Sequence, residues 1–111
     1  MSDPLHNPLP DSITAFDENI VHPKRIVIMT VLFLSREITE GELSKATGIS
    51  WGSLSTHLNR LEREGYIERR KAVTSRGVRT VVKITEKGYR AYKMEIEKLK
   101  SLVDLDKKLL F

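Results

Sequence analysis

The chain has 111 residues, enough for one small domain and too few for two well-packed ones. Charged residues make up 31% of the chain and hydrophobic residues 40%, as in an ordinary globular domain, and the net charge is +4. The sequence contains no cysteine, which excludes disulfides, thiolate metal sites and cysteine-based redox sensing.

No stretch of the sequence reads as a signal peptide or a membrane span. The N-terminus lacks a basic start followed by an apolar stretch. The longest apolar run, residues 26–34, is interrupted by Thr30 and is far shorter than the ~20 residues that span a bilayer. We therefore expect a cytoplasmic protein with no membrane partner.

Residues 1–21 are predicted to form an N-terminal arm. Three of the four prolines lie within the first ten residues, which disfavours regular structure there. Asp11 or Ser12 can cap a short helix at the end of the arm. Such a helix would carry its apolar residues on one face, namely Ile13, Phe16 and Ile20.

An apolar helix is predicted over residues 23–36. Pro23 suits its first turn, because the N–H that proline lacks has no partner at that position. Residues 26–34 make the helix apolar on all sides, whereas a small domain buries only one stripe of a helix. The other face needs a second cover, which we expect to be another subunit. The alternative is a central β-strand buried on both sides.

A short helix and a turn are predicted next. Thr39 begins the helix, and Glu42 completes a capping box three residues later. The helix stops before Gly48, and residues 48–50 form a three-residue turn.

A longer helix, residues 51–64, begins after the capping residue Ser50 and stops at Gly65. Its leucines recur at i, i+4 and i+7 and predict one buried stripe. These are Leu54, Leu58 and Leu61. The opposite face is small and polar near the helix start and basic further along.

A β-hairpin with a basic tip is predicted after this helix. Residues 66–73 and 79–84 read as strands, joined by residues 74–78, in which Gly77 readily adopts a positive φ. The fold class is therefore mainly α with a small β-hairpin, a winged helix-turn-helix over residues 22–88.

A C-terminal helix is predicted from Glu86 to at least Leu102, with Thr85 as its cap, and residues 86–111 are assigned to dimerisation. Its apolar residues follow the 3-4 spacing of a coiled-coil seam, and a second stripe widens that face. The seam is Tyr89, Tyr92, Ile96, Leu99 and Val103, and the second stripe is Leu102, Leu105 and Leu109. We expect a homodimer through helices at about 23–36 and 86–110. The alternative is that the last helix covers only the core of its own chain.

Positive charge is concentrated between residues 60 and 90. This segment holds ten of the 19 Lys and Arg residues and four acidic residues, a clustering typical of nucleic-acid binding. Short hydroxyl side chains permit close approach to DNA, Asn59 can read adenine, and Arg60 or Arg63 can reach a phosphate or a guanine. The candidate DNA-binding residues are Ser50, Gly52, Ser53, Ser55, Thr56, Asn59, Arg60, Arg63, Arg76 and Arg79.

Several nearby residues have simpler interpretations. Trp51 is expected to pack against the preceding helix or the arm rather than stack on a base. His57 flanks the leucine stripe and is expected to be a half-buried packing residue. Arg69, Arg70 and Lys71 fit a solvated strand edge. The three histidines are far apart in the sequence, so neither a metal site nor a cofactor is expected.

Four stretches are typical of one family. They are ELSKATGIS at 42–50, LSTHLNRLEREGYI at 54–67, the wing at 76–80 and ITEKG at 84–88. Together they resemble the winged-helix domain of MarR/ArsR-type transcriptional regulators, most of all small archaeal and bacterial MarR-like DNA-binding proteins. The resemblance implies a homodimer with helix 51–64 in the major groove and the wing, about 74–80, on the flanking minor groove or backbone. Trp51 departs from the family, which usually has a small or basic residue there.

The sequence therefore predicts a transcriptional regulator that binds specific double-stranded DNA as a homodimer. An enzyme is not expected, because the chain has no glycine-rich phosphate loop, no cluster of metal ligands and no nucleophile–base pair. The alternative function is a winged-helix protein–protein interaction module within a larger complex. The residues identify neither the operator nor an effector ligand.

Overall fold

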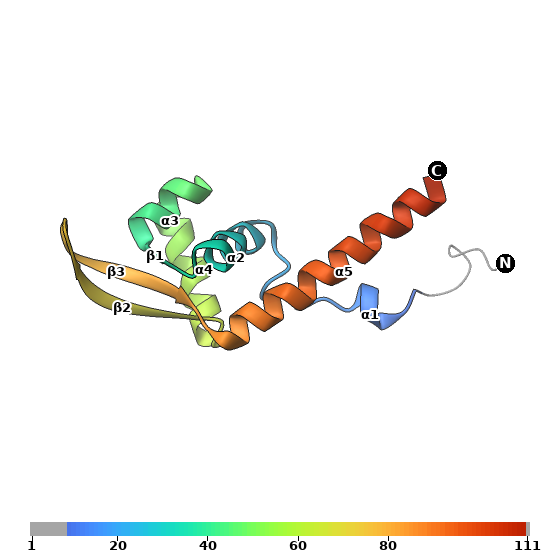
Figure 1. Cartoon of the computed structure of the whole chain (residues 1–111), viewed down its shortest axis with the longest axis horizontal. Coiled ribbons are helices and arrows are strands. Elements are labelled where there is room, and N and C mark those ends of the chain that lie inside the picture. Colours follow the sequence, from blue (N-terminus) through green and yellow to red (C-terminus); the bar gives the residue numbers. More distant parts are fainter. Residues whose placement is uncertain (1–8, 111) are drawn as a thin grey trace.

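The computed structural model describes residues 9–110, without the side chains of Ile13 and residues 108–110. The first eight residues of the predicted arm, and the predicted roles of the Ile13 and Leu109 side chains, therefore lie outside what is described. The elements in chain order are α1 (Asp11–Thr14), α2 (Pro23–Ser35), β1 (Glu37–Thr39), α3 (Glu40–Thr47), α4 (Trp51–Arg63), β2 (Ile67–Thr74), β3 (Gly77–Ile84) and α5 (Glu86–Leu110) (Figure 1).

The core lies between α2, α4 and the sheet. The predicted leucine stripe of α4 is confirmed, because Leu54, Leu58 and Leu61 are completely buried. They join completely buried residues of α2 and α3 in one apolar cluster: Ile28, Met29, Leu32 and Leu43. The predicted winged helix-turn-helix fold is confirmed, with the β2–β3 hairpin as the wing.

The sheet contains a strand that the sequence pattern did not predict. Its order is β1-β3-β2, with antiparallel pairs throughout. The missed strand, β1, has only three residues, too few for an alternation of polar and apolar side chains to be recognised in the sequence. It forms because its backbone pairs with β3, which lies far away in the sequence. The predicted hairpin turn is tighter than expected, since Thr74 pairs with Gly77 and only two residues lie between them. Gly77 adopts the positive φ that was expected, 96°.

The segment predicted as an apolar helix or a buried strand is the helix α2. Its own chain buries one face and covers part of the other, and the expected cover of the remainder by a second subunit stays a prediction. Phe33 stacks on Tyr89 with ring centroids 4.6 Å apart, and the hydroxyls of Thr30 and Tyr92 are hydrogen-bonded at 2.7 Å. Of its large apolar side chains, Val27 and Leu34 remain exposed.

The predicted helix at the end of the arm is shorter than expected. α1 has four residues, and its N-cap is Pro10 rather than Asp11 or Ser12. Phe16 and Ile20 follow the helix in irregular chain, yet Ile20 is buried in the core. The prediction of a single helical face was wrong because one turn is too short to carry it.

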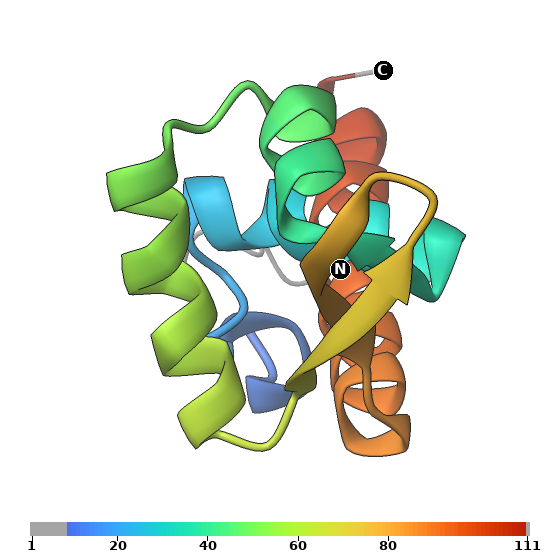
Figure 2. The same ribbon diagram turned by 90° about the vertical axis from the view of Figure 1, so that its left-hand side faces the viewer.

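The long helix α5 packs against the core near its start and extends away from the core toward its end. Tyr92, near its start, is buried against α2, whereas Met94 and Val103 are exposed. Figure 1 shows its C-terminal half running away from the helix-turn-helix and the wing, with α1 beside it. Figure 2 shows α4 and α5 on opposite sides of the molecule. Among the described residues, no helix combines the length and the apolar character needed to cross a membrane.

The first turn of α5 is docked tightly on the chain that follows α4. Thr85 caps the helix as predicted, because its Oγ1 accepts a hydrogen bond from the N–H of Gly88 at 3.0 Å. The same hydroxyl donates to the carbonyl of Gly65 at 2.6 Å. A Cβ on Gly88 would lie 2.1 Å from the carbonyl oxygen of Tyr66, so only glycine fits here.

Gly88→Ala is therefore expected to destabilise the fold by at least the ~1–3 kcal/mol typical of overpacking. Gly41→Ala in α3 is the matched control, since its Cβ would meet nothing within 4 Å. The control should leave the free energy of unfolding unchanged or raise it by up to about 1 kcal/mol. Urea denaturation followed by circular dichroism measures both; equal stability of the two variants would contradict the docking described for α5.

Candidate nucleic-acid interface

The start of α4 is held in place by the turn before it. Thr39 caps α3 as predicted, with its side chain accepting from the N–H of Glu42 at 3.1 Å. The Ser44 hydroxyl donates to the carbonyl of Ile49 at 2.7 Å, and the Ile49 side chain is buried in the core. Ser50 occupies the N-cap position of α4, but its side chain makes no capping hydrogen bond. The turn thus orients α4 without using the Ser50 hydroxyl.

The predicted DNA-binding residues lie on the exposed surfaces of α4 and the wing. Nine of the ten are exposed, and the tenth, Ser53, is half-buried. The guanidinium groups of Arg60, Arg63 and Arg76 form no ion pair with any described residue. Arg79 donates to the carbonyl of Val78 at 2.9 Å. These side chains therefore offer positive charge that the described part of the chain does not neutralise.

A shallow groove separates α3 from the tip of the wing. Basic side chains predominate in it, with Lys45 from α3 and two arginines from the wing against a single acid, Glu42. The remaining lining residues are small or hydroxylated. The complete lining is Thr39, Gly41, Glu42, Lys45, Thr74, Ser75, Arg76 and Arg79.

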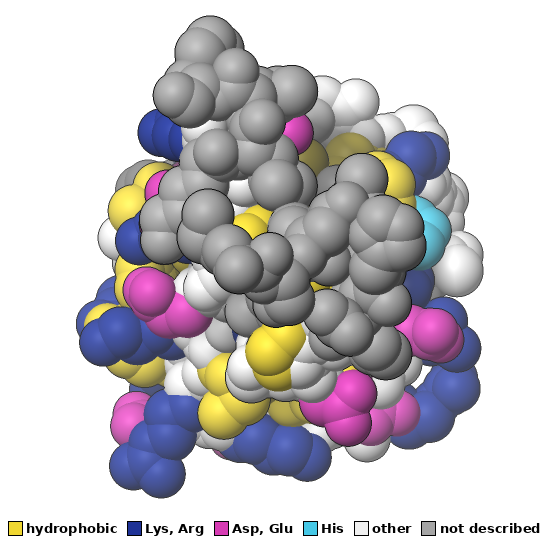
Figure 3. Space-filling model, turned by 90° about the vertical axis from the view of Figure 1, so that its right-hand side faces the viewer, with side chains coloured by type: hydrophobic (Ala, Val, Ile, Leu, Met, Phe, Trp, Pro, Cys, Tyr) yellow, Lys and Arg dark blue, Asp and Glu magenta, His cyan; other side chains and the backbone are white. Residues whose placement is uncertain are grey.

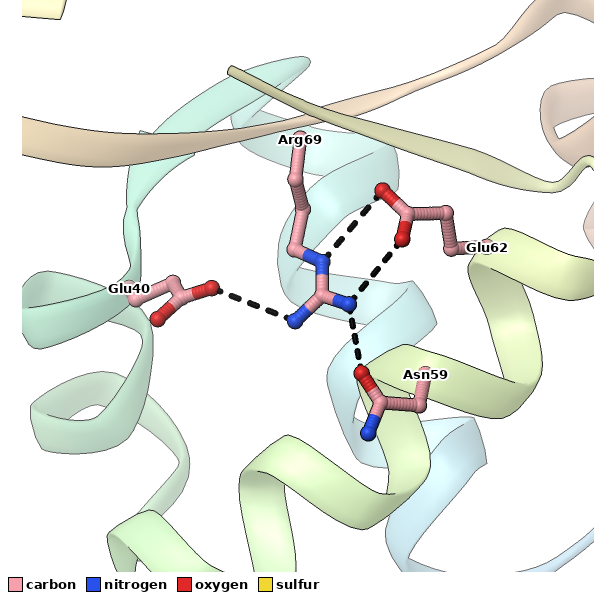
Figure 4. Close-up of polar contacts among 4 residues, drawn as sticks. All are labelled: Glu40, Asn59, Glu62 and Arg69. Atoms are coloured by element: carbon pink, nitrogen blue, oxygen red, sulfur yellow. Dashed lines mark hydrogen bonds and ion pairs between the residues drawn. The ribbon is translucent and has the colours of Figure 1, made fainter. Parts of the chain in front are cut away.

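Arg69 joins the wing to both helices of the helix-turn-helix (Figure 4). From β2, its guanidinium donates to both carboxylate oxygens of Glu62 in α4, at 3.0 and 3.4 Å, and to Glu40 in α3 at 3.5 Å. The hydrogen bonds from Arg69 hold the pKa of the Glu62 carboxyl below its usual range. The predicted solvated strand edge is wrong for this residue, because its side chain is only 20% exposed. The neighbouring Arg70 pairs with Glu37 of β1.

The same network changes the expectation for Asn59. Its Oδ1 accepts a hydrogen bond from Arg69 at 2.5 Å, and Figure 4 shows its amide nitrogen turned away from the guanidinium. Reading adenine with both amide atoms needs Oδ1 as an acceptor and Nδ2 as a donor. With Oδ1 already engaged, Asn59 is better suited to donate from Nδ2 to an acceptor.

Trp51 differs from its expected place. It is 57% exposed at the first position of α4, so the prediction that it packs against the preceding helix or the arm is wrong. The reason is that Ile49, two residues earlier, already fills the core beneath the turn. An exposed indole at the start of α4 belongs with the candidate interface, and the sequence signal for it was its departure from the family pattern.

His57 is half-buried beside the leucine stripe, as predicted. Its Nδ1 lies 3.1 Å from a guanidinium nitrogen of Arg25, a buried residue of α2. Burial, and then the charge of Arg25, lower the pKa of the imidazole. Within residues 9–110, no group of three or more His, Cys, Asp and Glu side chains is arranged to hold a metal ion.

Comparison with known proteins places this geometry in a family. The chain matches the winged helix DNA-binding domain family over residues 25–103. An uncharacterised protein of Methanocaldococcus jannaschii is 32% identical over 78 residues, covering 70% of this chain and 85% of that protein. The HTH-type transcriptional regulator YgaV of Escherichia coli is 43% identical over 47 residues, covering 42% of this chain and 48% of that regulator. The chain thus spans about half the length of YgaV.

A transcriptional regulator homologue from Pyrococcus horikoshii OT3 has the same fold. Its structure superimposes with a TM-score of 0.78 at 28% identity, covering 86% of this chain and 96% of that one. The predicted resemblance to MarR-like winged-helix regulators is confirmed, and two of these relatives, YgaV and the Pyrococcus horikoshii protein, are named as transcriptional regulators or their homologues. The chain belongs to the winged helix DNA-binding domain family and has the fold of a transcriptional regulator.

Proposed function

We propose that the protein regulates transcription by binding specific sites in double-stranded DNA, with α4 in the major groove. The observation that carries this proposal is exposed positive charge that no described carboxylate pairs with, from Arg60 and Arg63 on α4 and Arg76 at the wing turn. The first half of α4 bears small and hydroxylated exposed residues, which permit close approach to base edges. A helix fits the ~12 Å width of the major groove.

The wing supplies the second contact in this proposal. Its two-residue turn carries Arg76, and Arg79 follows on β3. Arginine is the side chain best suited to a narrow minor groove and to bidentate phosphate binding. Because Arg69 fixes β2 against α4, the wing and α4 meet DNA as one rigid unit.

A protein–protein interaction module is the alternative function. Such a module would present an apolar or acidic surface on the exposed face of α4. Here the acid on that face, Glu62, is bound by Arg69, and the exposed apolar side chain is Trp51 alone among Trp51–Arg63. The charge pattern therefore favours DNA.

The first test measures affinity for mixed-sequence duplex DNA at several salt concentrations. Each phosphate contact adds about −0.9 to the slope of log K against log salt. Replacing Arg76 and Arg79 together by Ala should weaken binding to every duplex and make the slope shallower by up to about 1.8 per protomer. Fluorescence anisotropy with a labelled duplex provides the measurement.

The control removes the same charge elsewhere, with Lys83→Ala and Arg90→Ala. Lys83 lies on the face of β3 opposite to Val82, which points into the core. Arg90 pairs with Glu86 on α5. The control should bind nearly as well as the wild type. A wild-type protein with no salt-dependent DNA binding would refute the proposed function.

We also propose that the regulator is a homodimer, formed mainly by the C-terminal half of α5. Figure 3, seen from the side where α5 ends, shows hydrophobic side chains reaching the surface between charged ones. A shallow groove on α5 is lined by Ile96, Leu99 and Val103, with Lys100, Asp104 and Lys107 at its edges. Exposed Val27 and Leu34 give α2 a smaller share than the sequence suggested. A two-fold dimer would present two α4 helices about 34–36 Å apart, and hence a pseudo-palindromic site.

Charge on this face should break the dimer. Val103→Glu places a carboxylate in the middle of the apolar stretch, and we expect sedimentation to show monomers where the wild type shows dimers. Lys93→Glu, an exposed position outside that groove, is the control and should leave the mass unchanged. A monomeric wild type at micromolar concentration would contradict the proposal.

A further inference from the structure

A second cluster of basic groups lies between the first turn of α2 and the flank of α4. Lys24 reaches across from α2 and donates through Nζ to the Ser53 hydroxyl at 3.0 Å. The rings of His22 and His57 lie with centroids 5.0 Å apart. Arg60, one helical turn beyond His57 and two turns beyond Ser53 on α4, adds a charge that acts on both imidazoles. From the sequence, Ser53 and Arg60 of this cluster were assigned to DNA binding, but they were not connected with His22, Lys24 or His57.

Both imidazoles are held with Nδ1 as an acceptor. His22 Nδ1 accepts from the backbone N–H of Lys24 at 3.3 Å, which makes His22 the N-cap of α2. His57 Nδ1 accepts from the guanidinium of Arg25 at 3.1 Å. A neutral imidazole that accepts on Nδ1 carries its hydrogen on Nε2. Each ring therefore has one N–H donor to offer.

The surroundings of this cluster are cationic. Arg25 uses its other N–H groups on the carbonyls of Asn19 and Glu18, and both contacts are to neutral groups. Asp17 is the carboxylate whose charge acts on Arg25, and it accepts from the hydroxyl of Tyr66. Burial, then Arg25, Lys24 and Arg60, lower the pKa of His22. Such surroundings disfavour a metal ion and favour an anion.

We infer that His22 and Lys24 form, with Ser53 and Arg60, a binding site for a backbone phosphate of the DNA that α4 reads. Lys24 already donates one hydrogen to Ser53, and its ammonium has two more for phosphate oxygens. The site rests on the proposed function, and it extends the interface from α4 and the wing to α2. It places a phosphate contact on the side of α4 away from Arg69 and the wing.

The site also predicts how DNA binding depends on pH. At neutral pH His22 is uncharged, and a phosphate beside it would favour the protonated imidazole. Proton uptake by His22 on binding makes the affinity rise as the pH falls, by at most tenfold per pH unit for one proton per protomer. Among the described residues, the charged and titratable groups that act on His22 are Lys24 and Arg25 of α2 and His57 and Arg60 of α4, all of them basic.

The main experiment compares Lys24→Gln with Lys83→Gln in salt titrations of the full chain with duplex DNA. Lys24→Gln should lower affinity several-fold and make the log–log slope shallower by about 0.9 per protomer. Lys83→Gln removes the same charge from the opposite face of the sheet and should change neither quantity. A further experiment adds inorganic phosphate to the protein without DNA and uses thermal unfolding to measure whether phosphate stabilises the fold.

A second variant, His22→Asn, keeps a good N-cap but removes the titrating ring. In the wild type, affinity should rise several-fold between pH 7.5 and 5.5, and in His22→Asn this rise should shrink. Circular dichroism checks that α2 is intact. A purely structural role for His22 would leave the pH dependence unchanged.

The outcomes separate this inference from the proposed function. If Lys24→Gln binds DNA like the wild type while the Arg76 and Arg79 variant binds weakly, the phosphate site is refuted and the proposed function stands. If the wild type does not bind DNA, both fail. If Lys24→Gln abolishes stabilisation by inorganic phosphate but leaves DNA binding unchanged, the site holds a small anion and the backbone assignment is wrong.

Discussion

The guanidinium of Arg69 is the contact on which the arrangement of this surface depends. It is the point where β2, α3 and α4 meet, through Glu40, Asn59 and Glu62. A wing on a two-stranded hairpin would otherwise be free to tilt, because its outer half has no core beneath it: Val73 and Val78 are both exposed. Three of the four Arg69 contacts are exposed, where an ion pair is worth only about 0–1 kcal/mol, so the wing's angle is held by the four contacts together rather than by any one of them.

The arginines of α4 and of the β2–β3 hairpin divide into two groups, according to whether a described carboxylate pairs with them. Arg69 and Arg70 pair with carboxylates and stabilise the sheet and its join to α4. Arg60, Arg63 and Arg76 have no carboxylate among the described residues. Leaving charges unpaired on one surface weakens the folded state slightly through mutual repulsion. The same charges should make DNA binding strongly dependent on salt, because each of these guanidinium groups can displace a counterion from a phosphate.

Features set by local sequence were predictable, and features set by contacts between distant segments were not. The stripe of Leu54, Leu58 and Leu61 follows from helical periodicity alone, and the Thr39 cap follows from a four-residue pattern. β1 is too short to leave a pattern and exists only through its pairing with β3. Most residues of the candidate surface were found from the sequence. The contacts of Arg69 with Asn59 and of Lys24 with Ser53 were not, because each joins residues of different elements and can be seen only once the fold is known.

The contact between the end of α4 and the start of α5 connects the proposed DNA-binding surface with the proposed dimer surface. The chain leaves α4 at Gly65, whose carbonyl accepts from the Thr85 hydroxyl, and Lys87 donates to the carbonyl of Glu64 at 2.7 Å. With Gly88 against the backbone of Tyr66, the first turn of α5 cannot slide relative to the end of α4. In a dimer held by α5, the separation of the two α4 helices would therefore follow the crossing angle of the α5 pair. Any ligand or partner that altered that angle would change the fit to DNA without touching α4.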